Sequence, residues 1–371
     1  MKKVLFMIHD LGPGGAEKVL VNLVNNIDKS KFKVTVLALF GGGVNEQFIN
    51  QNEVKLITCH KKMIRGNSHF MKLFSPKRLY DFYVKDEYDI VVSYLEGPCA
   101  RIISGCTNKK TKKVAWIHIQ QHNLKRSSVS FRSTSEAVEC YEKFEQIIGV
   151  SEYVCQSFEK VFKLSKPTKV LYNTVDSSYI RKKSKENIND VKFCESEIKI
   201  CAVGKLLKSK GFDRLVNIQR RLQKEGYNTH FYFLGEGPLR KELEENIKQY
   251  GLSDHISLLG YQKNPYKYIK QCDMFVCASL QEGFSTATTE ALILGVPVVT
   301  TEVSGMKEML GDNNEFGLVV GNSEDALYAG IKKLLDDKEL LDFYTVQAGK
   351  RGEKFDLVET IREVERMLIQ L

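Results

Sequence analysis

The chain has 371 residues, of which 43% are hydrophobic and 27% charged, a balance typical of a globular protein with about two domains. Its nine cysteines show no metal-ligand spacing, which argues against a metal site or a disulfide framework and favours a reducing compartment. No stretch approaches the roughly 20 apolar residues that cross a bilayer. The apolar run at residues 4–8 is too short for a secretory signal, so we expect a cytoplasmic protein.

Charge is unevenly distributed along the chain. Residues 1–186 carry 31 basic and 18 acidic side chains, a net charge of +13, whereas the remaining residues carry 24 and 28, a net charge of −4. An excess of positive charge in one half predicts an anionic partner for that half, such as nucleic acid, an acidic substrate or a membrane surface. A solvated lysine-rich surface explains the same distribution equally well.

The first half alternates short apolar runs with helical patterns, as βαβ units do. The runs predict strands at residues 3–9, 33–40, 54–59, 89–94, 113–119, 146–151 and 169–172. The first strand leads into a glycine-rich loop with Gly14 and Gly15, where main-chain amides can approach a phosphate or a sugar closely. His118 lies at the end of the fifth run, where a single histidine is more often structural than catalytic.

A polar, charged stretch at residues 177–197 is interpreted as a linker. A second alternating series follows, with strands predicted at residues 198–203, 231–234, 256–261, 274–278 and 298–302. The chain closes with an amphipathic helix predicted at residues 357–371. These patterns predict an α/β protein with two doubly wound parallel sheets, one in a domain of residues 1–176 and one in a domain of residues 198–356.

Charged side chains follow two strands of the second series. Lys205 and Lys210 lie in one turn and can converge on a diphosphate as point charges, although either can also be a surface lysine. Glu282 lies in the loop after residues 274–278, and Glu290 lies about a turn and a half inside the helix that Ser285 is predicted to cap. Two carboxylates at one strand-to-helix junction can hold two hydroxylated parts of one ligand. An ordinary loop with two solvated glutamates is the alternative interpretation.

Together with their flanks, these two glutamates resemble the E-x7-E element of retaining, family-4 glycosyltransferases with the GT-B fold. The agreement extends to Gly283-Phe284-Ser285, to residues 294–299 and to the Gly-Gly-Ala-Glu sequence of the first loop. The resemblance covers most of the chain and is strongest at residues 198–310. It implies two Rossmann-like domains that face a cleft, with the helix at residues 357–371 crossing back onto the first domain.

The resemblance also implies roles for the charged residues. Glu290 would accept hydrogen bonds from ribose hydroxyls, and Glu282 would hold a hydroxyl of the donor sugar. Lys205 and Lys210 would neutralise the diphosphate leaving group, where charge develops in the transition state. The family usually has Arg at the position of Lys205, so this chain keeps the charge there but loses the bidentate fork.

Further positions would surround the donor. The amides of Gly283, Phe284 and Ser285 would hold its negative part, and Gly14 and Gly15 would approach it from the first loop. His118 would contact the donor sugar, with His122 as the alternative if the register differs. Gly235 would lie beside the nucleotide and Tyr261 near its base.

The implied activity is transfer of a hexosyl or N-acetylhexosaminyl group from a nucleotide sugar, with retention of anomeric configuration. The expected donor is UDP-linked. The expected acceptor is a glycan or lipid-linked glycan in cell-surface polysaccharide assembly. Because no Asp-x-Asp element is present and the lysines can take over a metal's task, we expect neither a metal nor a cofactor. Two alternatives remain: a sugar-nucleotide epimerase or hydrolase of the same fold, and a non-catalytic sugar-binding subunit. Nucleic-acid binding is disfavoured because the basic half contains no recognisable motif for it.

Basic residues in the first half are interleaved with large apolar ones. The segment contains Lys61, Lys62, Met63, Ile64, Arg65, Phe70, Met71, Lys72, Leu73, Phe74, Lys77 and Arg78, and further basic clusters lie at residues 109–113 and 125–126. Such a composition suits an anionic membrane surface, because lysines bind headgroups and apolar side chains enter the acyl boundary. We therefore expect peripheral, salt-sensitive association with the inner face of the cell membrane, weakened by reversing Lys62, Arg65 and Lys72 to Glu. The alternative is that Phe70, Leu73 and Phe74 belong to the core.

Overall fold

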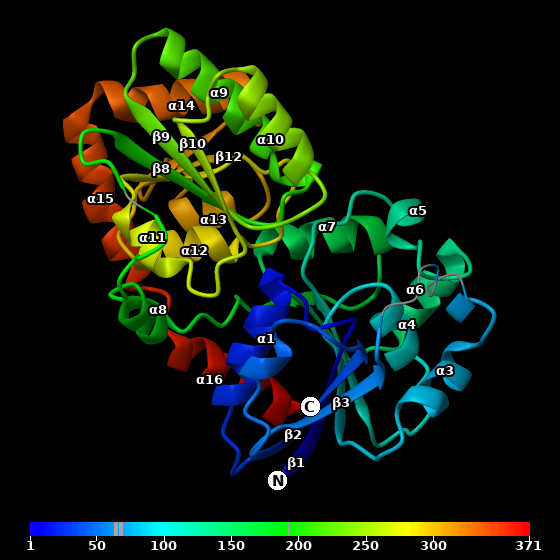
Figure 1. Ribbon diagram of the computed structural model, residues 1–371. Coiled ribbons are helices and arrows are strands. Elements are labelled where there is room, and N and C mark those ends of the chain that lie inside the picture. The colour runs from blue at the N-terminus through cyan, green and yellow to red at the C-terminus, as the bar shows by residue number, and fades with distance from the viewer. Residues whose placement is uncertain (63–65, 67–69, 192) are drawn as a thin grey trace. The chain divides into compact units, whose positions relative to one another are not determined.

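The computed structural model describes residues 1–62, 66, 70–191 and 193–371 (Figure 1). The chain forms two compact units. Unit 1 contains Met1–Thr174 and Leu357–Leu371, and unit 2 contains Val175–Asp356.

Unit 1 is built on a parallel sheet with the strand order β3-β2-β1-β4-β5-β6-β7. The strands are β1 (Lys2–Ile8), β2 (Phe32–Phe40), β3 (Lys55–His60), β4 (Ile90–Ser93), β5 (Lys112–Ile117), β6 (Gln146–Gly149) and β7 (Thr168–Val170). The central strands β1 and β4 are almost continuous apolar runs because helices cover both faces of such a sheet. The seven strands predicted from the sequence are all present, with bounds that differ by a few residues.

The helices of unit 1 include one from the end of the chain. They are α1 (Gly15–Asn26), the 3-10 turn η1 (Glu46–Phe48), α3 (Pro76–Tyr83), α4 (Pro98–Ile103), α5 (Leu124–Ser127), α6 (Thr134–Glu142), α7 (Glu152–Phe162) and α16 (Leu357–Gln370). Helix α16 buries Val364 and Leu368, and Glu365 accepts a hydrogen bond from the amide of Asp28 at 2.8 Å. The closing helix therefore packs on the strands and helices formed by the first residues of the chain.

Unit 2 contains a second parallel sheet, with the order β10-β9-β8-β11-β12-β13. Its strands are β8 (Ile198–Val203), β9 (Thr229–Leu234), β10 (Ile256–Gly260), β11 (Met274–Cys277), β12 (Val298–Thr301) and β13 (Leu318–Val320). Its helices are α8 (Ser177–Lys183), the 3-10 turn η2 (Lys208–Lys210), α9 (Phe212–Lys224), α10 (Arg240–Gln249), α11 (Tyr266–Gln271), α12 (Thr286–Ile293), α13 (Met306–Leu310), α14 (Glu324–Asp336) and α15 (Lys338–Gly352). Helices α9, α10 and α14 lie on one face of the sheet, and α11, α12 and α13 lie on the other (Figure 1). The predicted α/β class with two doubly wound parallel sheets is confirmed.

Two features differ from the sequence-based prediction. Strand β13 was not predicted, because three residues are too short for a recognisable apolar run. The stretch interpreted as a linker is also structured, since it contains α8 and packs against α11 and α12. Its polar residues make specific contacts: Asn264 donates to the carbonyl of Lys183 at 2.9 Å, and the Tyr268 hydroxyl donates to Asp190 at 2.6 Å. This stretch is therefore hydrogen-bonded to residues in and just before α11.

Candidate functional site

The strand order of unit 2 reverses direction at β8. The chain builds β9 and β10 on one side of this strand and β11, β12 and β13 on the other. In open parallel sheets, ligands bind outside the carboxyl ends of the strands at such a switch point. The loops that follow β8 and β11 meet here, and they carry Lys210 and Glu282.

Main-chain contacts fix these two loops against each other. The amide of Leu280 donates to the carbonyl of Ser209 at 2.8 Å. Gly211 has a φ of +67°, and a Cβ at this position would lie 2.2 Å from the carbonyl oxygen of Ala278. Both the left-handed backbone and the close approach require glycine here. As a result, the turn that carries Lys210 packs directly against the end of β11.

Lys210 and Glu282 form an ion pair at this junction. The Lys210 Nζ lies 2.5 Å from the Glu282 Oε1, and the Ser279 hydroxyl donates to the same oxygen at 2.6 Å. Burial acts to lower the pKa of Lys210, but the carboxylate of Glu282 outweighs it and holds that pKa above its usual value. The lysine is therefore positively charged throughout the physiological pH range. The sequence predicted both residues for the site, but it gave no indication that they contact each other.

Lys205 lies in the same loop as Lys210 and is half-buried. Among the described residues no ion pair holds its side chain, in contrast to Lys210. The aliphatic stem of Lys210 passes Gly204, since a Cβ on that glycine would lie 3.9 Å from the Lys210 Cδ. Of the three lysines in this loop, Lys208 and Lys210 are paired with carboxylates, and Lys205 is not paired with any described carboxylate.

Gly235 and Tyr261 follow the ends of β9 and β10. Gly235 has a φ of +147°, and a Cβ there would lie 1.9 Å from the carbonyl oxygen of Gly204, so the β9 loop packs directly on the β8 loop. Tyr261 is exposed just beyond β10. Both residues therefore lie at the edge of the sheet that carries Lys210, on the side toward β10.

Helix α12 begins where the sequence predicts. The hydroxyl of Ser285 accepts from the amide of Thr288 at 3.3 Å, which confirms this residue as the N-cap. Ser285 and Phe284 are both buried, and only 4% of Glu290 is exposed. Gly305 allows the next loop to approach closely, because a Cβ there would lie 2.9 Å from the carbonyl oxygen of Gly283. The segment from Gly283 to Glu290 is thus a fixed part of unit 2.

Unit 1 has its own switch point, between β1 and β4. The loop after β1 is held by its own side chains, since Asp10 accepts from the amide of Gly12 at 2.8 Å and pairs with His9 Nδ1 at 2.7 Å. Gly14 is the N-cap of α1 and Gly15 its first residue. A Cβ on Gly14 would lie 1.9 Å from the Glu17 carboxylate, which folds back over the loop.

His118 follows β5 and is 8% exposed. Its ring lies 4.7 Å from the ring of Tyr94 and 6.4 Å from that of Trp116, measured between centroids. Burial lowers its pKa to about 3, although a hydrogen bond to the carbonyl of Tyr94 opposes this effect. The imidazole is therefore neutral at physiological pH, and His122, the alternative residue, is exposed.

One ring nitrogen of His118 has no partner among the described residues. Its Nε2 is buried without a hydrogen-bond partner in the described structure. A neutral imidazole accepts or donates a hydrogen bond at such an atom, depending on its tautomer. Unsatisfied buried polar atoms call for an explanation, and a ligand hydroxyl would provide one.

Glu96, which the sequence did not single out, holds the main chain of His118. Its Oε1 accepts from the amides of His118 and Ile119, the second at 2.9 Å. Burial raises the pKa of Glu96, although the hydrogen bonds from these amides oppose the increase. Glu96 joins the ends of the adjacent strands β4 and β5. This role cannot be recognised from the sequence until the two strands are known to be neighbours.

The depressed pKa of His118 predicts a pH dependence of stability. Between pH 6.5 and pH 3 the unfolded state binds a proton at this side chain and the folded state does not, so the free energy of unfolding decreases as the pH falls. We expect His118 to contribute a loss of about 2 kcal/mol between pH 7.5 and pH 5. Urea unfolding at both pH values should show a smaller pH-dependent loss in His118→Asn. An equal loss in the variant would show that His118 is not buried in its neutral form.

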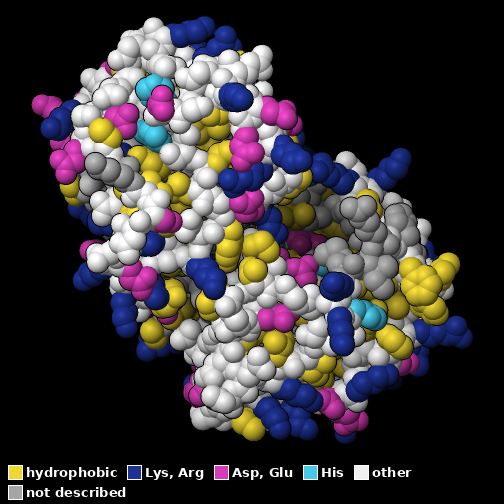
Figure 2. Space-filling model, viewed as in Figure 1, with side chains coloured by type: hydrophobic (Ala, Val, Ile, Leu, Met, Phe, Trp, Pro, Cys, Tyr) yellow, Lys and Arg dark blue, Asp and Glu magenta, His cyan; other side chains and the backbone are white. Residues whose placement is uncertain are grey.

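The segment before α3 carries apolar side chains at the surface. Phe70, Leu73 and Phe74 are 64%, 71% and 38% exposed, so the alternative that they belong to the core is wrong. Figure 2 shows apolar side chains exposed near α3 and α6, with lysine and arginine side chains around them. Met63, Ile64 and Arg65, which the sequence placed in the same surface, lie outside the described residues.

Metal-ligating clusters and membrane-spanning helices both have recognisable signatures in a structure. Among the described residues, no group of three or more His, Cys, Asp or Glu side chains could hold a metal ion. In the same part of the chain, no helix has the length and apolar character needed to span a bilayer.

Comparison with known proteins relates the two units to known families. Residues 13–179 match the family described as "Glycosyltransferase Family 4", and residues 183–351 match "Glycosyl transferases group 1". Two relatives from Campylobacter jejuni span the chain. One is the N-acetylgalactosamine-N,N'-diacetylbacillosaminyl-diphospho-undecaprenol 4-alpha-N-acetylgalactosaminyltransferase, 30% identical over all of both chains. The other is a GalNAc-alpha-(1->4)-GalNAc-alpha-(1->3)-diNAcBac-PP-undecaprenol alpha-1,4-N-acetyl-D-galactosaminyltransferase, 24% identical over 100% of this chain and 99% of its own.

Solved structures share the fold at lower sequence identity. HepE of Anabaena, in complex with UDP and glucose, superposes with a TM-score of 0.78 over all of both chains at 18% identity. The lipopolysaccharide outer core galactosyltransferase WaaB gives a TM-score of 0.71, covering 100% of this chain and 99% of its own at 15% identity. Together with the full-length relative, these matches confirm the resemblance seen in the glutamate pair and its flanks. The chain therefore belongs to the family-4 glycosyltransferases with the GT-B fold.

Proposed function

We propose that the protein transfers a hexosyl or N-acetylhexosaminyl group from a UDP-linked sugar to a lipid-linked glycan acceptor in cell-surface polysaccharide assembly, with retention of anomeric configuration and without a metal. Two full-length relatives are named for transfer of N-acetylgalactosamine to undecaprenol-linked glycans, and a structural neighbour was solved with UDP and glucose. The observation that carries the proposal is the charged Lys210 at the switch point of unit 2, paired with Glu282.

The ion pair provides a way to recognise a diphosphate. A diphosphate at the switch point would compete with Glu282 for Lys210, and it would also neutralise Lys205. Lys210 would then stabilise the negative charge that develops on the leaving group. Once released, the Glu282 carboxylate would be available to a hydroxyl of the donor sugar, as proposed from the sequence. Glu290 would accept from the ribose hydroxyls, with the amides of Gly283, Phe284 and Ser285 near the negative part of the donor.

Unit 1 would contribute through a buried imidazole. The unpartnered Nε2 of His118 suits a donor-sugar hydroxyl, because a hydroxyl can both donate to and accept from a ring nitrogen. Gly14 and Gly15 would allow main-chain approach to the donor. Gly235 and Tyr261 would lie beside the nucleotide and its base.

A screen of nucleotide sugars by thermal unfolding tests the proposal. A ligand at a hundred times its Kd stabilises the folded state by about 2.7 kcal/mol, so a UDP-sugar should raise the melting temperature clearly. The shift should be strongly reduced in Lys210→Ala and retained in Lys208→Ala, whose side chain in the same turn instead pairs with Glu242. No shift with any nucleotide sugar, in a folded protein, would contradict the proposal.

We predict that chelation leaves the activity unchanged. The lysines supply the positive charge at the diphosphate, so a divalent cation has no remaining task in this account. Initial rates should be compared before and after extended treatment with EDTA. A loss of activity that Mn²⁺ or Mg²⁺ restores would overturn the metal-free mechanism.

We also predict that the product keeps the α configuration of the donor. The resemblance to retaining enzymes supports this expectation, because the positions of the bound donor and acceptor decide which face of the sugar ring is attacked. The coupling constant of the anomeric proton in the isolated product measures the outcome directly. A β linkage formed from an α-linked donor would place the protein outside the retaining class.

Acceptor binding is proposed for unit 1. Lipid-linked acceptors reside at a membrane, and the basic side chains of this unit suit anionic headgroups. We propose a cytoplasmic protein that binds peripherally to the inner face of the cell membrane, with the exposed segment before α3 as part of the contact.

A further inference from the structure

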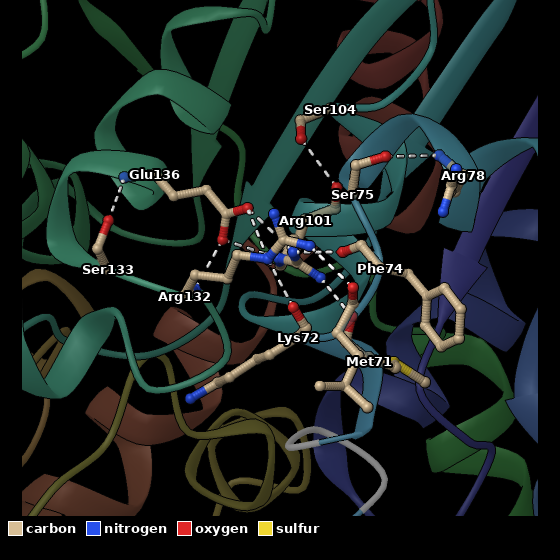
Figure 3. Close-up of polar contacts among 11 residues, drawn as sticks. Met71, Lys72, Phe74, Ser75, Arg78, Arg101, Ser104, Arg132, Ser133 and Glu136 are labelled. Atoms are coloured by element: carbon tan, nitrogen blue, oxygen red, sulfur yellow. Dashed lines mark hydrogen bonds and ion pairs between the residues drawn. The ribbon is translucent and has the colours of Figure 1, made fainter.

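The exposed segment before α3 is anchored by its main chain. Four successive carbonyl oxygens, those of Met71, Lys72, Leu73 and Phe74, all accept hydrogen bonds from arginines (Figure 3). Arg101 donates to the first and last of these carbonyls at 2.9 and 2.8 Å. Arg132 donates to the two between them at 2.6 and 3.0 Å. We call this arrangement the arginine clamp.

The clamp is itself held by a carboxylate. Arg101, on α4, is only 1% exposed and forms two parallel bonds with Glu136 of α6, at 3.0 and 2.9 Å. Burial acts to raise the pKa of Glu136, but the guanidinium of Arg101 and the amide of Arg132 hold it below its usual value. The carboxylate therefore stays ionised and keeps the buried arginine in place.

The clamp determines where the side chains of the segment are found. Because its carbonyls bond inward to Arg101 and Arg132, Leu73 and Phe74 stay at the surface together with Phe70. Phe70 and Phe74 contact each other edge-to-face, with ring centroids 5.5 Å apart. Three large apolar side chains within five residues form a fixed apolar surface, which is unfavourable in water without a partner.

The charge around this surface indicates its partner. Lys61, Lys62, Lys72, Lys77 and Arg78 flank it along the chain, and the acidic residue on α3, Asp81, is already paired with Lys77 at 2.9 Å. Cations around an apolar surface match the boundary between anionic headgroups and acyl chains. A second copy of the chain that met this surface with its own would bring the same positive charge and be repelled.

We propose that the arginine clamp holds Phe70, Leu73 and Phe74 in a preformed conformation that inserts into an anionic lipid surface, with Arg101, Arg132 and Glu136 as positioning residues. The inference rests on the proposed function for its biological setting, a lipid-linked acceptor. Its physical content is separate, since insertion into lipid needs no glycosyl transfer.

Insertion can be measured with a fluorescent reporter. The single tryptophan of the chain, Trp116, is buried, so Leu73→Trp adds the one exposed indole. Adding phosphatidylglycerol-containing vesicles should shift its emission to the blue, and vesicles of phosphatidylcholine alone should give a much smaller shift. Arg132→Lys keeps the charge but replaces the rigid planar fork that spans the carbonyls of Lys72 and Leu73 with a flexible point charge, and it should weaken vesicle binding by about threefold to tenfold without lowering the melting temperature. Because Arg132 is 46% exposed, this change leaves no buried group unpaired.

Cosedimentation with vesicles provides the second measurement. Phe70→Ser/Leu73→Ser/Phe74→Ser should reduce partition by at least about tenfold, since the lost apolar area no longer leaves water. The control Phe343→Ser/Val346→Ser removes side chains that are 49% and 55% exposed on α15 and should bind as the unmodified protein does.

Three results would overturn the proposal. The first is unchanged partition of the triple variant, and the second is the absence of a blue shift in the Leu73→Trp variant on anionic vesicles. The third is a dimer in sedimentation velocity that the triple variant abolishes. Loss of transfer activity with normal lipid binding would contradict the proposed function alone.

Discussion

Replacing Lys210 or Glu290 with Ala should each lower the turnover number by at least about a hundredfold, the scale that loss of transition-state electrostatics produces. Lys210 is a charged group at the switch point, and the surrounding loops hold it there through the Ser209–Leu280 main-chain bond. Glu290 is nearly fully buried on α12, so its carboxylate occupies a fixed position. Steady-state kinetics with saturating acceptor should separate the effect on turnover from the effect on donor binding.

Two controls make this prediction specific. Lys208→Ala removes a cation two residues from Lys210, but its side chain is exposed and pairs with Glu242 at 2.6 Å, so the rate should stay within about twofold of normal. Glu290→Gln keeps the size and the buried setting while removing the charge, and it should be impaired nearly as much as the Ala variant. Near-normal turnover in a folded Lys210→Ala or Glu290→Ala variant would remove that residue from the site.

Arg101→Leu should destabilise the protein by about 3–5 kcal/mol, because it removes both guanidinium hydrogen bonds to the partly buried Glu136 and leaves it only the more distant Arg132, whose Nε lies 4.0 Å away. The variant also loses the donors to the carbonyls of Met71 and Phe74. Urea unfolding at neutral pH, monitored by Trp116 in unit 1, should show the loss as a lower transition midpoint.

The double variant Arg101→Leu/Glu136→Leu should recover a large part of this loss, since removing both charges removes the desolvation cost of each. The matched control is Arg362→Leu on α16, where the arginine is 63% exposed and lies 3.6 Å from Glu359. Its effect should stay below about 0.5 kcal/mol. An equally small effect of Arg101→Leu would show that the clamp contributes nothing to the stability of unit 1.

The sequence was most informative where a structural role depends on residues that are close together in the chain. Ser285 was predicted as an N-cap, and its hydroxyl accepts from the amide of Thr288, because capping depends on residues three positions apart. The strands could be predicted equally well from the sequence, since buried parallel strands such as β1 and β4 are almost continuous apolar runs. Only β13, with three residues, was too short to recognise.

The sequence was least informative about contacts between residues far apart in the chain. Lys210 and Glu282 were both proposed for the site, but their ion pair depends on β8 and β11 being neighbours. The same limit applies to Glu96, which binds the main chain after the adjacent strand, and to Arg101, which joins α4, α6 and the segment before α3. No pattern within one element marks such residues, because charged side chains in a sequence are ordinarily expected to lie in solvent.

The most direct test of the central claim is transfer of a labelled sugar to lipid. The protein is incubated with a radiolabelled UDP-sugar and an undecaprenol-diphosphate-linked glycan in vesicles, and label is followed in the organic phase after extraction. The account predicts label in the lipid fraction, UDP released in equal amount, and loss of both with Lys210→Ala. Release of UDP or free sugar without an acceptor, a new nucleotide sugar, or donor binding with no product would instead identify a hydrolase, an epimerase or a non-catalytic subunit, and each would contradict the account.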